Sequence, residues 1–292
     1  MDPPRGSMSS EAATSADNPT TLPRIKFQTA ELLAQEIDKT PGDVLYVEEV
    51  SPQDFSTIEE YREGRYRKYR FRRFYPEQRL LIVAIQTEIH EQLHWTLVFD
   101  ILFRICEMGL EHHWLSTGGD TYPQEGDGSV GAGEADASGR PMQPGQRSSR
   151  RWPTLAVEVG HSQSLQHLRD DMGWWFKESN HLVKVVLLIK YHPGPLEGIT
   201  IEQWRERPVG PCGVQLELTC QQVINITKNS ATTNRVFPLS YNVTGGALEL
   251  RFSDLFLRDP GQGERDIVVE AERLQRLAAM VGRSRNRASA NT

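Results

Sequence analysis

The clearest pattern of hydrophobic and polar positions lies between residues 152 and 191. The apolar run Leu155–Val159 predicts a buried strand, and a polar turn, an amphipathic helix and a second apolar strand, Val183–Ile189, follow it. Strand, helix and strand in this order predict a βαβ unit with parallel strands. We therefore expect an α/β fold whose ligand sites open at the ends of these strands.

The rest of the pattern predicts helices and further strands around this unit. The longest helical pattern runs from Thr87 to Met108 and is apolar on nearly all sides in its later turns, which predicts a central, buried helix. Further helices are predicted over residues 27–39 and 267–281, and further strands over residues 44–50, 65–75, 80–85, 214–226, 236–241 and 247–252. Together these elements predict a mixed sheet with flanking helices and additional C-terminal β-structure.

Three segments lack such patterns. Residues 1–23 are rich in Ser, Thr, Pro and Ala, and residues 282–292 form a basic tail, so both are predicted to be disordered. Residues 117–151 hold eight glycines and three prolines, which predicts a disordered, Gly-rich insertion. A single α/β domain is predicted over residues 24–281.

The composition narrows the classes of protein. The 292 residues carry a formal net charge of -6, and their mean hydropathy is -0.52. This acidic balance argues against a protein that coats nucleic acid. The three cysteines have neither the spacing of a metal site nor the even number of a disulfide framework. Without a signal peptide or an apolar run of about 18 residues, we expect an intracellular protein of cytoplasm or nucleus with no membrane partner.

One carboxylate, Glu158, lies in the middle of the predicted strand Leu155–Val159. A charge in such a place is costly unless it is paired or binds a metal ion. Glu91 on the long helix and Asp136 in the Gly-rich segment complete a set of three carboxylates, the hard oxygen ligands that Mg²⁺ or Mn²⁺ prefers. The alternative is a buried ion pair between Glu158 and Arg169.

This order of residues resembles the PD-(D/E)XK nuclease superfamily, in particular its restriction-endonuclease-like branch. The matching residues are Pro153, Leu155, Glu158, Val159, Ser162 and Ser164. The chain is also similar to a large group of uncharacterised fungal proteins, through Glu134, Asp136 and Ser138, then Trp152–Glu158, then Leu168–Phe176. The resemblance implies a nuclease-like domain that hydrolyses nucleic acid, with Mg²⁺ or Mn²⁺ held by Glu91, Asp136 and Glu158.

The chain departs from the nuclease pattern at one position. Where a lysine is expected two residues beyond the glutamate, the chain has Gly160, and the nearest cations are Arg169 and Lys177. If this chain is an active nuclease, we expect Arg169 or Lys177 to contact the scissile phosphate and water bound to the metal ion to attack it. The missing lysine leaves a second hypothesis open, in which the fold is degenerate and binds nucleic acid or protein without cleaving it.

A zinc hydrolase is the third hypothesis. The sequence His90-Glu91-Gln92-Leu93-His94 is an H-E-x-x-H motif, in which two histidines bind zinc and the glutamate acts as base. The third ligand would come from Asp100, Glu111, His112 or His113. The alternative is that His90 and His94 simply pack.

A basic stretch runs from Arg62 to Arg73, with seven basic residues among twelve and three interleaved aromatic residues. This mixture is typical of surfaces that bind phosphates and bases. The predicted nucleic-acid-binding residues are Arg65, Arg67, Lys68, Arg70 and Arg72. The alternative is an edge strand that its charges keep from pairing with other chains.

Overall fold

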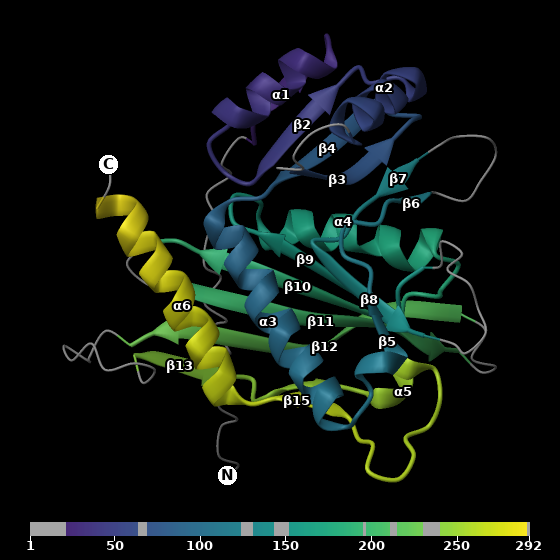
Figure 1. Cartoon of the computed structure of the whole chain (residues 1–292), viewed down its shortest axis with the longest axis vertical. Coiled ribbons are helices and arrows are strands. Elements are labelled where there is room, and N and C mark those ends of the chain that lie inside the picture. The colour runs from purple at the N-terminus through teal and green to yellow at the C-terminus, as the bar shows by residue number, and fades with distance from the viewer. Residues whose placement is uncertain are drawn as a thin grey trace, which may run out of the picture.

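The computed structural model describes residues 22–63, 69–123, 131–142, 152–194, 197–210, 215–229 and 240–290. These residues form a mixed α/β fold with two large sheets and a small two-stranded one (Figure 1). The predicted fold class is therefore confirmed. No helix in this part of the chain is long and apolar enough to cross a membrane.

The larger sheet has seven strands in the order β13-β12-β11-β10-β9-β8-β5. Its centre is the predicted βαβ unit, in which β9 (Leu155–Gly160) and β10 (Val185–His192) are parallel and are joined by α4 (Leu165–Glu178). The other strands, all antiparallel to their neighbours, are β5 (Trp114–Ser116), β8 (Ala137–Pro141), β11 (Gly198–Val209), β12 (Gln215–Lys228) and β13 (Tyr241–Thr244).

Helices cover both faces of this sheet (Figure 1). Helices α3 (Glu88–Glu107) and α6 (Ala271–Ala290) pack on one face, and α4 packs on the other. Successive side chains of a strand point to opposite faces. Leu155, Val157 and Val159 therefore join the core under α3 and α6, while Ala156 and Glu158 lie on the α4 side.

The second sheet, which we call the N-terminal sheet, has six strands in the order β1-β2-β4-β3-β7-β6. Its strands are β1 (Arg24–Lys26), β2 (Val44–Glu48), β3 (Tyr69–Tyr75), β4 (Leu80–Ile85), β6 (Tyr122–Pro123) and β7 (Ala132–Gly133). Helices α1 (Ala30–Lys39) and α2 (Pro52–Glu63) form a hydrophobic core with one of its faces. The chain is completed by the 3-10 helix η1 (Glu111–His113), β14 (Leu248–Leu250), α5 (Phe252–Phe256) and β15 (Ile267–Val269).

A β-bulge in β3 determines where two arginines point. Phe71 pairs with Val83 on β4 and Arg73 with Ile82, so Arg72 is the extra residue. A bulge changes the direction of side chains along a strand. As a result Phe71 and Phe74 both enter the core under α1 and α2, while Arg72 and Arg73 make their contacts on the side of the larger sheet.

The predicted disorder of the Gly-rich insertion is wrong for the described residues between 117 and 142. They form β6, β7 and β8, and Asp136 is 2% exposed. The glycines allow close packing here: a Cβ on Gly133 would lie 2.6 Å from the Trp174 ring, and one on Gly139 would lie 2.5 Å from the Trp114 ring. Glycines that serve close approach cannot be told from flexible ones by composition.

Other boundaries also differ from the predicted ones. The predicted helix 267–281 begins as strand β15 and continues as α6 to Ala290, so the expected loose tail is helical as far as that residue. The predicted strand 247–252 ends early and is followed by α5. Helix α2 and strand β11 were not predicted, and residues 1–21 and 236–239 lie outside the described part. Short apolar runs such as β15 fit strand and helix equally well.

A buried ion pair between helix α2 and the residue that follows β7 generates a first prediction. Arg62 Nη2 lies 2.6 Å from Glu134 Oε1, and the two side chains are 4% and 1% exposed. We expect Arg62→Met to lower the free energy of unfolding by about 3–5 kcal/mol, because it leaves a buried carboxylate without its cation. Urea denaturation measures this. Arg24→Met, which removes an exposed pair with Glu48, should cost less than about 1 kcal/mol; equal losses in the two variants would contradict the prediction.

Candidate functional site

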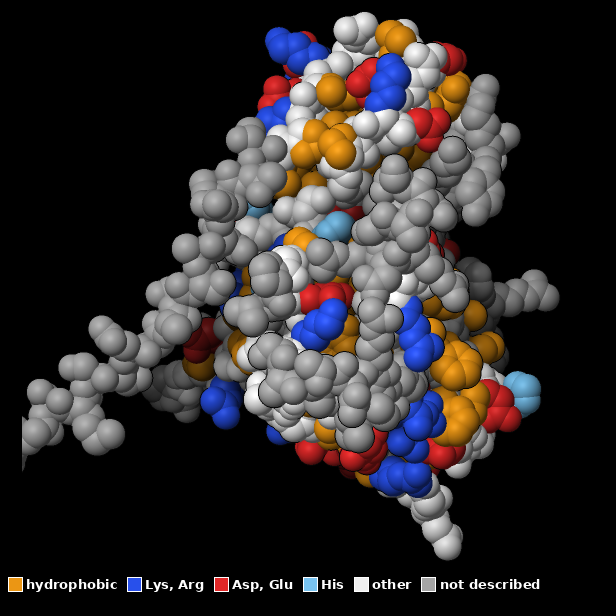
Figure 2. All heavy atoms as spheres, turned by 90° about the vertical axis from the view of Figure 1, so that its left-hand side faces the viewer, with side chains coloured by type: hydrophobic (Ala, Val, Ile, Leu, Met, Phe, Trp, Pro, Cys, Tyr) orange, Lys and Arg blue, Asp and Glu red, His pale blue; other side chains and the backbone are white. Residues whose placement is uncertain are grey.

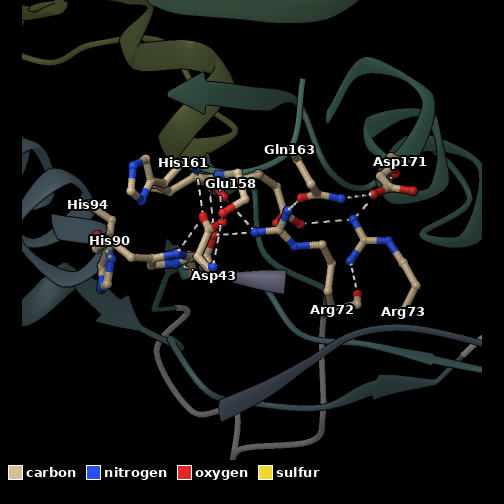
Figure 3. A network of polar contacts seen from close by, with 12 residues as sticks. Asp43, Arg72, Arg73, His90, His94, Glu158, His161, Gln163 and Asp171 are labelled. Atoms are coloured by element: carbon tan, nitrogen blue, oxygen red, sulfur yellow. Dashed lines mark hydrogen bonds and ion pairs between the residues drawn. The ribbon is translucent and has the colours of Figure 1, made fainter. Parts of the chain in front are cut away.

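A group of buried charges lies where the N-terminal sheet meets the end of β9 (Figure 3). We call it the charge cluster; it consists of Asp43, Arg72, Arg73, His90, Asp136 and Glu158. None of these residues is more than 2% exposed. Three carboxylates face two guanidinium groups and one imidazole, so the cluster is neutral when His90 carries a proton.

Five separate segments supply these side chains. Asp43 precedes β2, Arg72 and Arg73 belong to β3, His90 lies in the first turn of α3, Asp136 precedes β8, and Glu158 is in β9. The backbone NH of Asp136 donates to the carbonyl of Val157 at 3.1 Å, which holds the aspartate beside β9. Helix α3 begins at this point because Thr87 caps it, accepting a hydrogen bond from the NH of His90.

The guanidinium of Arg72 lies among oxygens from several residues. Its Nη2 donates to the Val159 carbonyl at 2.6 Å and to Asp136 Oδ2 at 3.1 Å. Its Nε lies 3.6 Å from Glu158 Oε2, and its Nη1 donates to Gln163 Oε1. The Arg72 guanidinium thus lies between Asp136 and Glu158, two of the three carboxylates predicted as metal ligands.

Arg73 binds the other oxygen of Glu158. Its Nη2 donates to Oε1 at 2.9 Å, and the Trp175 indole donates to the same atom at 2.6 Å. The guanidinium carbon of Arg73 lies 4.5 Å from the centre of the Trp174 ring and 4.7 Å from that of Trp175. Burial raises the pKa of Glu158 above its ordinary value, and although the two arginines oppose this, the Asp136 carboxylate adds to it.

His90 connects the two aspartates. Its Nε2 lies 3.0 Å from Asp136 Oδ1, and its Nδ1 lies 3.4 Å from Asp43 Oδ2. Burial by itself lowers the pKa of His90, but the two carboxylates outweigh it and raise that pKa to about 9. The same contacts, against the opposing effect of burial, hold the pKa of each aspartate well below its usual range. His90 is therefore an imidazolium at neutral pH.

The structure brings together two of the three predicted metal ligands. Asp136 and Glu158 share the Arg72 guanidinium. Glu91 interacts with other residues: its Oε2 accepts from the Trp95 indole at 2.9 Å, and its side chain is 32% exposed. The neighbouring residue, His90, is the one on α3 that reaches Asp136.

The two histidines of the predicted zinc motif, His90 and His94, contact other protein groups. Both ring nitrogens of His90 face aspartates, and His94 Nδ1 lies 3.1 Å from the carbonyl of His90. The two imidazole rings are 5.8 Å apart and inclined by 78°. The packing alternative describes His90 and His94 better than the zinc motif does.

The predicted phosphate-binding cations lie outside the cluster. Arg169 donates through Nε to Glu202 Oε2 at 2.9 Å, so the ion pair expected between Arg169 and Glu158 is replaced by one with β11. Lys177 is 80% exposed and lies beside Glu178. Neither approaches Glu158, whose cations come from β3.

The basic stretch contributes mainly to the interior. Arg62, Arg72 and Arg73 are buried in ion pairs, and Arg70 is half-buried. The other three predicted nucleic-acid-binding residues, Arg65, Arg67 and Lys68, lie outside the described residues. Arg72 is therefore wrongly predicted as a surface contact, because the bulge directs it inward.

The residues present do not fit a divalent metal ion in this arrangement. Asp136 Oδ2, Glu158 Oε1 and the Val159 carbonyl accept hydrogen bonds from Arg72, Arg73, Trp175 and a backbone NH group. Glu158 Oε2 and Asp136 Oδ1 accept none, but they face cations, at 3.6 Å from Arg72 Nε and 3.0 Å from His90 Nε2. Across the described ranges, no group of three or more His, Cys, Asp or Glu side chains has a geometry that holds a metal.

The sequence analysis did not select Asp43 and Arg73 of the charge cluster, nor Gln163, which accepts a hydrogen bond from Arg72. A signal existed for Arg73, because Phe71-Arg72-Arg73-Phe74 places two charges between two core residues, and strict alternation would bury one arginine in the core. Asp43 gave no comparable signal. Its carboxylate accepts from the backbone NH groups of His161 and Ser162 at 2.6 and 2.7 Å, contacts that bridge more than a hundred residues of chain.

A scan against protein-family models found no matching family, and a search of curated proteins found no match.

The imidazolium generates a pH-dependent prediction. The pKa of His90 rises from 6.5 to about 9 on folding, so its contribution to stability is complete below pH 6.5 and is lost as the pH rises through 9. The difference in unfolding free energy between the wild type and His90→Gln should shrink by about 3 kcal/mol between pH 6 and pH 9.5. Urea denaturation across this range measures it. His112→Gln, at a residue whose side chain is 91% exposed, is the control; a constant His90 difference would contradict the assignment.

Proposed function

We propose that this chain is a nuclease-like fold of the PD-(D/E)XK kind in which Arg72 takes the place of the metal ion, and that it acts by binding another protein. The observation that carries this proposal is the position of the Arg72 guanidinium between Asp136 and Glu158. The order of the motif residues and the βαβ unit that holds Glu158 support the nuclease-like ancestry. The site itself supports a binding module without hydrolysis.

The physical argument concerns competition for oxygens. A divalent ion needs several hard oxygen ligands, and here Arg72 already interacts with Asp136, Glu158 and the Val159 carbonyl. The surrounding carboxylates raise the pKa of Arg72 further, against the effect of burial, so it keeps its charge at every relevant pH. A metal ion would have to displace a guanidinium that is 1% exposed and anchored in a β-bulge.

The same burial argues against a phosphodiester substrate at this site. Hydrolysis requires that a phosphate reach the metal and the attacking water. In the charge cluster the carboxylates are at most 2% exposed, and their hydrogen-bonding atoms face protein groups. Three arginines of the basic stretch, Arg62, Arg72 and Arg73, are buried in ion pairs, and the net charge is -6. These facts favour a protein partner over a nucleic acid; an intracellular location stays a prediction.

Replacing Arg72 tests the proposal directly. We expect Arg72→Ala to lower the unfolding free energy by about 3–5 kcal/mol in EDTA, because two buried carboxylates lose their cation. Mn²⁺ should then restore part of it, about 3 kcal/mol when its concentration reaches about 100 times its Kd, because the freed oxygens become ligands. Thermal and urea unfolding with and without Mn²⁺ measure this, and the wild type should not respond.

Arg62→Met is the matched control. It also breaks a buried arginine–carboxylate pair, but it leaves the charge cluster intact, so Mn²⁺ should not rescue it. The proposal is overturned if wild-type protein cleaves DNA or RNA in Mn²⁺ and Glu158→Gln abolishes that cleavage. The proposal is also overturned if Mn²⁺ raises the melting temperature of the wild type and Glu158→Gln abolishes this rise.

A further inference from the structure

Helix α3 exposes a row of aromatic side chains. Trp95, Phe99 and Phe103 are 58%, 63% and 39% exposed, and they follow one another at four-residue spacing. Residues that are four apart lie on one face of a helix. We call this row the aromatic ridge; it spans about 12 Å of the helix. Contiguous exposed apolar surface of this kind marks an interaction site more often than isolated hydrophobic residues do.

The ridge is not needed for the core of this protein. The opposite face of α3 already supplies buried residues to the larger sheet, among them Leu93, Leu97, Ile101 and Ile105. The polar atom of the ridge is also satisfied, because the Trp95 indole donates to Glu91. What the ridge offers to a partner is therefore apolar surface.

The neighbouring helix gives the surface a positive charge. Helix α6 packs beside α3, and its described side chains include three arginines, Arg273, Arg276 and Arg283, and one glutamate. Arg273 lies beside the ridge, with its guanidinium carbon 5.3 Å from the Phe103 ring, while Met280 adds a side chain that is 43% exposed. In Figure 2, blue and orange side chains lie next to one another along the lower right-hand edge, on the side where Figure 1 places α3 and α6.

Two arginines beside the ridge are offset by acids, so the exposed Arg276 of α6 is the described residue that supplies positive charge there. Asp100 pairs with Arg273 at 2.9 Å, and Glu107 pairs with Arg104 at 2.8 Å. A partner with negative charges beside its apolar face would therefore complement the α6 side of the surface.

We infer that the aromatic ridge and the adjoining arginines of α6 bind an acidic amphipathic helix of a partner protein. This inference rests on the proposed function and names the surface and the kind of partner. Apolar side chains of the partner, three and four residues apart, pack along Trp95, Phe99 and Phe103, and its Asp and Glu side chains face Arg276. A straight ridge on a helix suits a second helix, which packs with its axis about 8–10 Å away.

A single-stranded nucleic acid suits the surface less well. Bases stack on open aromatic faces, but the Phe103 ring has Arg104 at 5.9 Å and Arg273 at 5.3 Å from its centre. The apolar rather than the stacking character of the ridge therefore favours a peptide.

Peptide display on the full chain tests the inference. A library of random peptides of about 16 residues is selected on wild-type protein, with counter-selection on the variant Trp95→Ala/Phe99→Ala. We expect the enriched peptides to carry net negative charge and apolar residues at helical spacing. A synthetic copy of an enriched peptide should bind wild type in fluorescence anisotropy and bind the double variant at least about tenfold more weakly.

Charge reversal gives an independent readout. Arg276→Glu should weaken binding of that peptide about tenfold and reduce its salt dependence. Two controls should bind as wild type does: Leu216→Ala removes an exposed apolar side chain of β12, and Arg207→Glu reverses an exposed charge of β11. All four variants change exposed residues, so their melting temperatures should stay near that of the wild type.

Several outcomes would overturn the inference. Enriched peptides that are basic, or that bind the double variant as tightly as wild type, would place recognition elsewhere. So would a single-stranded oligonucleotide, or a second copy of the chain in sedimentation velocity, that occupies the ridge and is lost in Trp95→Ala/Phe99→Ala. If no acidic peptide binds the ridge but Arg72→Ala still gains Mn²⁺ binding, the inferred binding surface is wrong and the proposed function stands. If the wild type cleaves nucleic acid in the presence of Mn²⁺, the proposed function is wrong.

Discussion

The contact of Arg72 with Asp136 and Glu158 is the interaction on which this structure depends. Two carboxylates at the centre of an α/β fold repel each other and have been removed from water, which is costly without a compensating positive charge. Here that charge comes from the chain itself, at 3.1 Å from one acid and 3.6 Å from the other. The N-terminal sheet thus supplies the cation of the larger sheet, so the two sheets depend on each other.

The remaining members of the charge cluster extend this dependence. His90 neutralises the far side of Asp136 and reaches Asp43, which in turn accepts from the turn after β9. Arg73 and Trp175 donate hydrogen bonds to one oxygen of Glu158, and Arg72 lies 3.6 Å from the other. Each buried acid therefore has a partner of its own, as buried ionic networks require. Desolvation offsets much of the attraction within such a network, whereas removal of one partner is strongly destabilising.

A tethered guanidinium also changes what the site can do. A metal ion in an open site keeps water and substrate as exchangeable ligands, whereas arginine holds no water for activation and presents its donors in one plane. Once the acids are enclosed in this way, recognition depends on the surface. The aromatic ridge on α3 lies on the opposite side of that helix from the core, and the arginines beside it come from the last helix of the chain. The core contacts and the proposed binding surface thus lie on different faces of α3.

Local pattern in the sequence was enough to predict the α/β class, the βαβ unit and the buried position of Glu158, because periodicity and a charge in an apolar run are local signals. Asp136 was selected only through the resemblance to the nuclease pattern, since by itself it lies in a loop of several acids. The cation that serves these acids was not predictable in this way. Arg72 lies more than sixty residues from Asp136 along the chain, and only the bulge in β3 directs both it and Arg73 to one side. The order within the Gly-rich segment was likewise decided by tertiary packing, since its glycines are required by the rings of Trp114 and Trp174. Ion pairs between distant segments depend on how the two sheets pack, and this packing cannot be predicted from any short stretch of sequence.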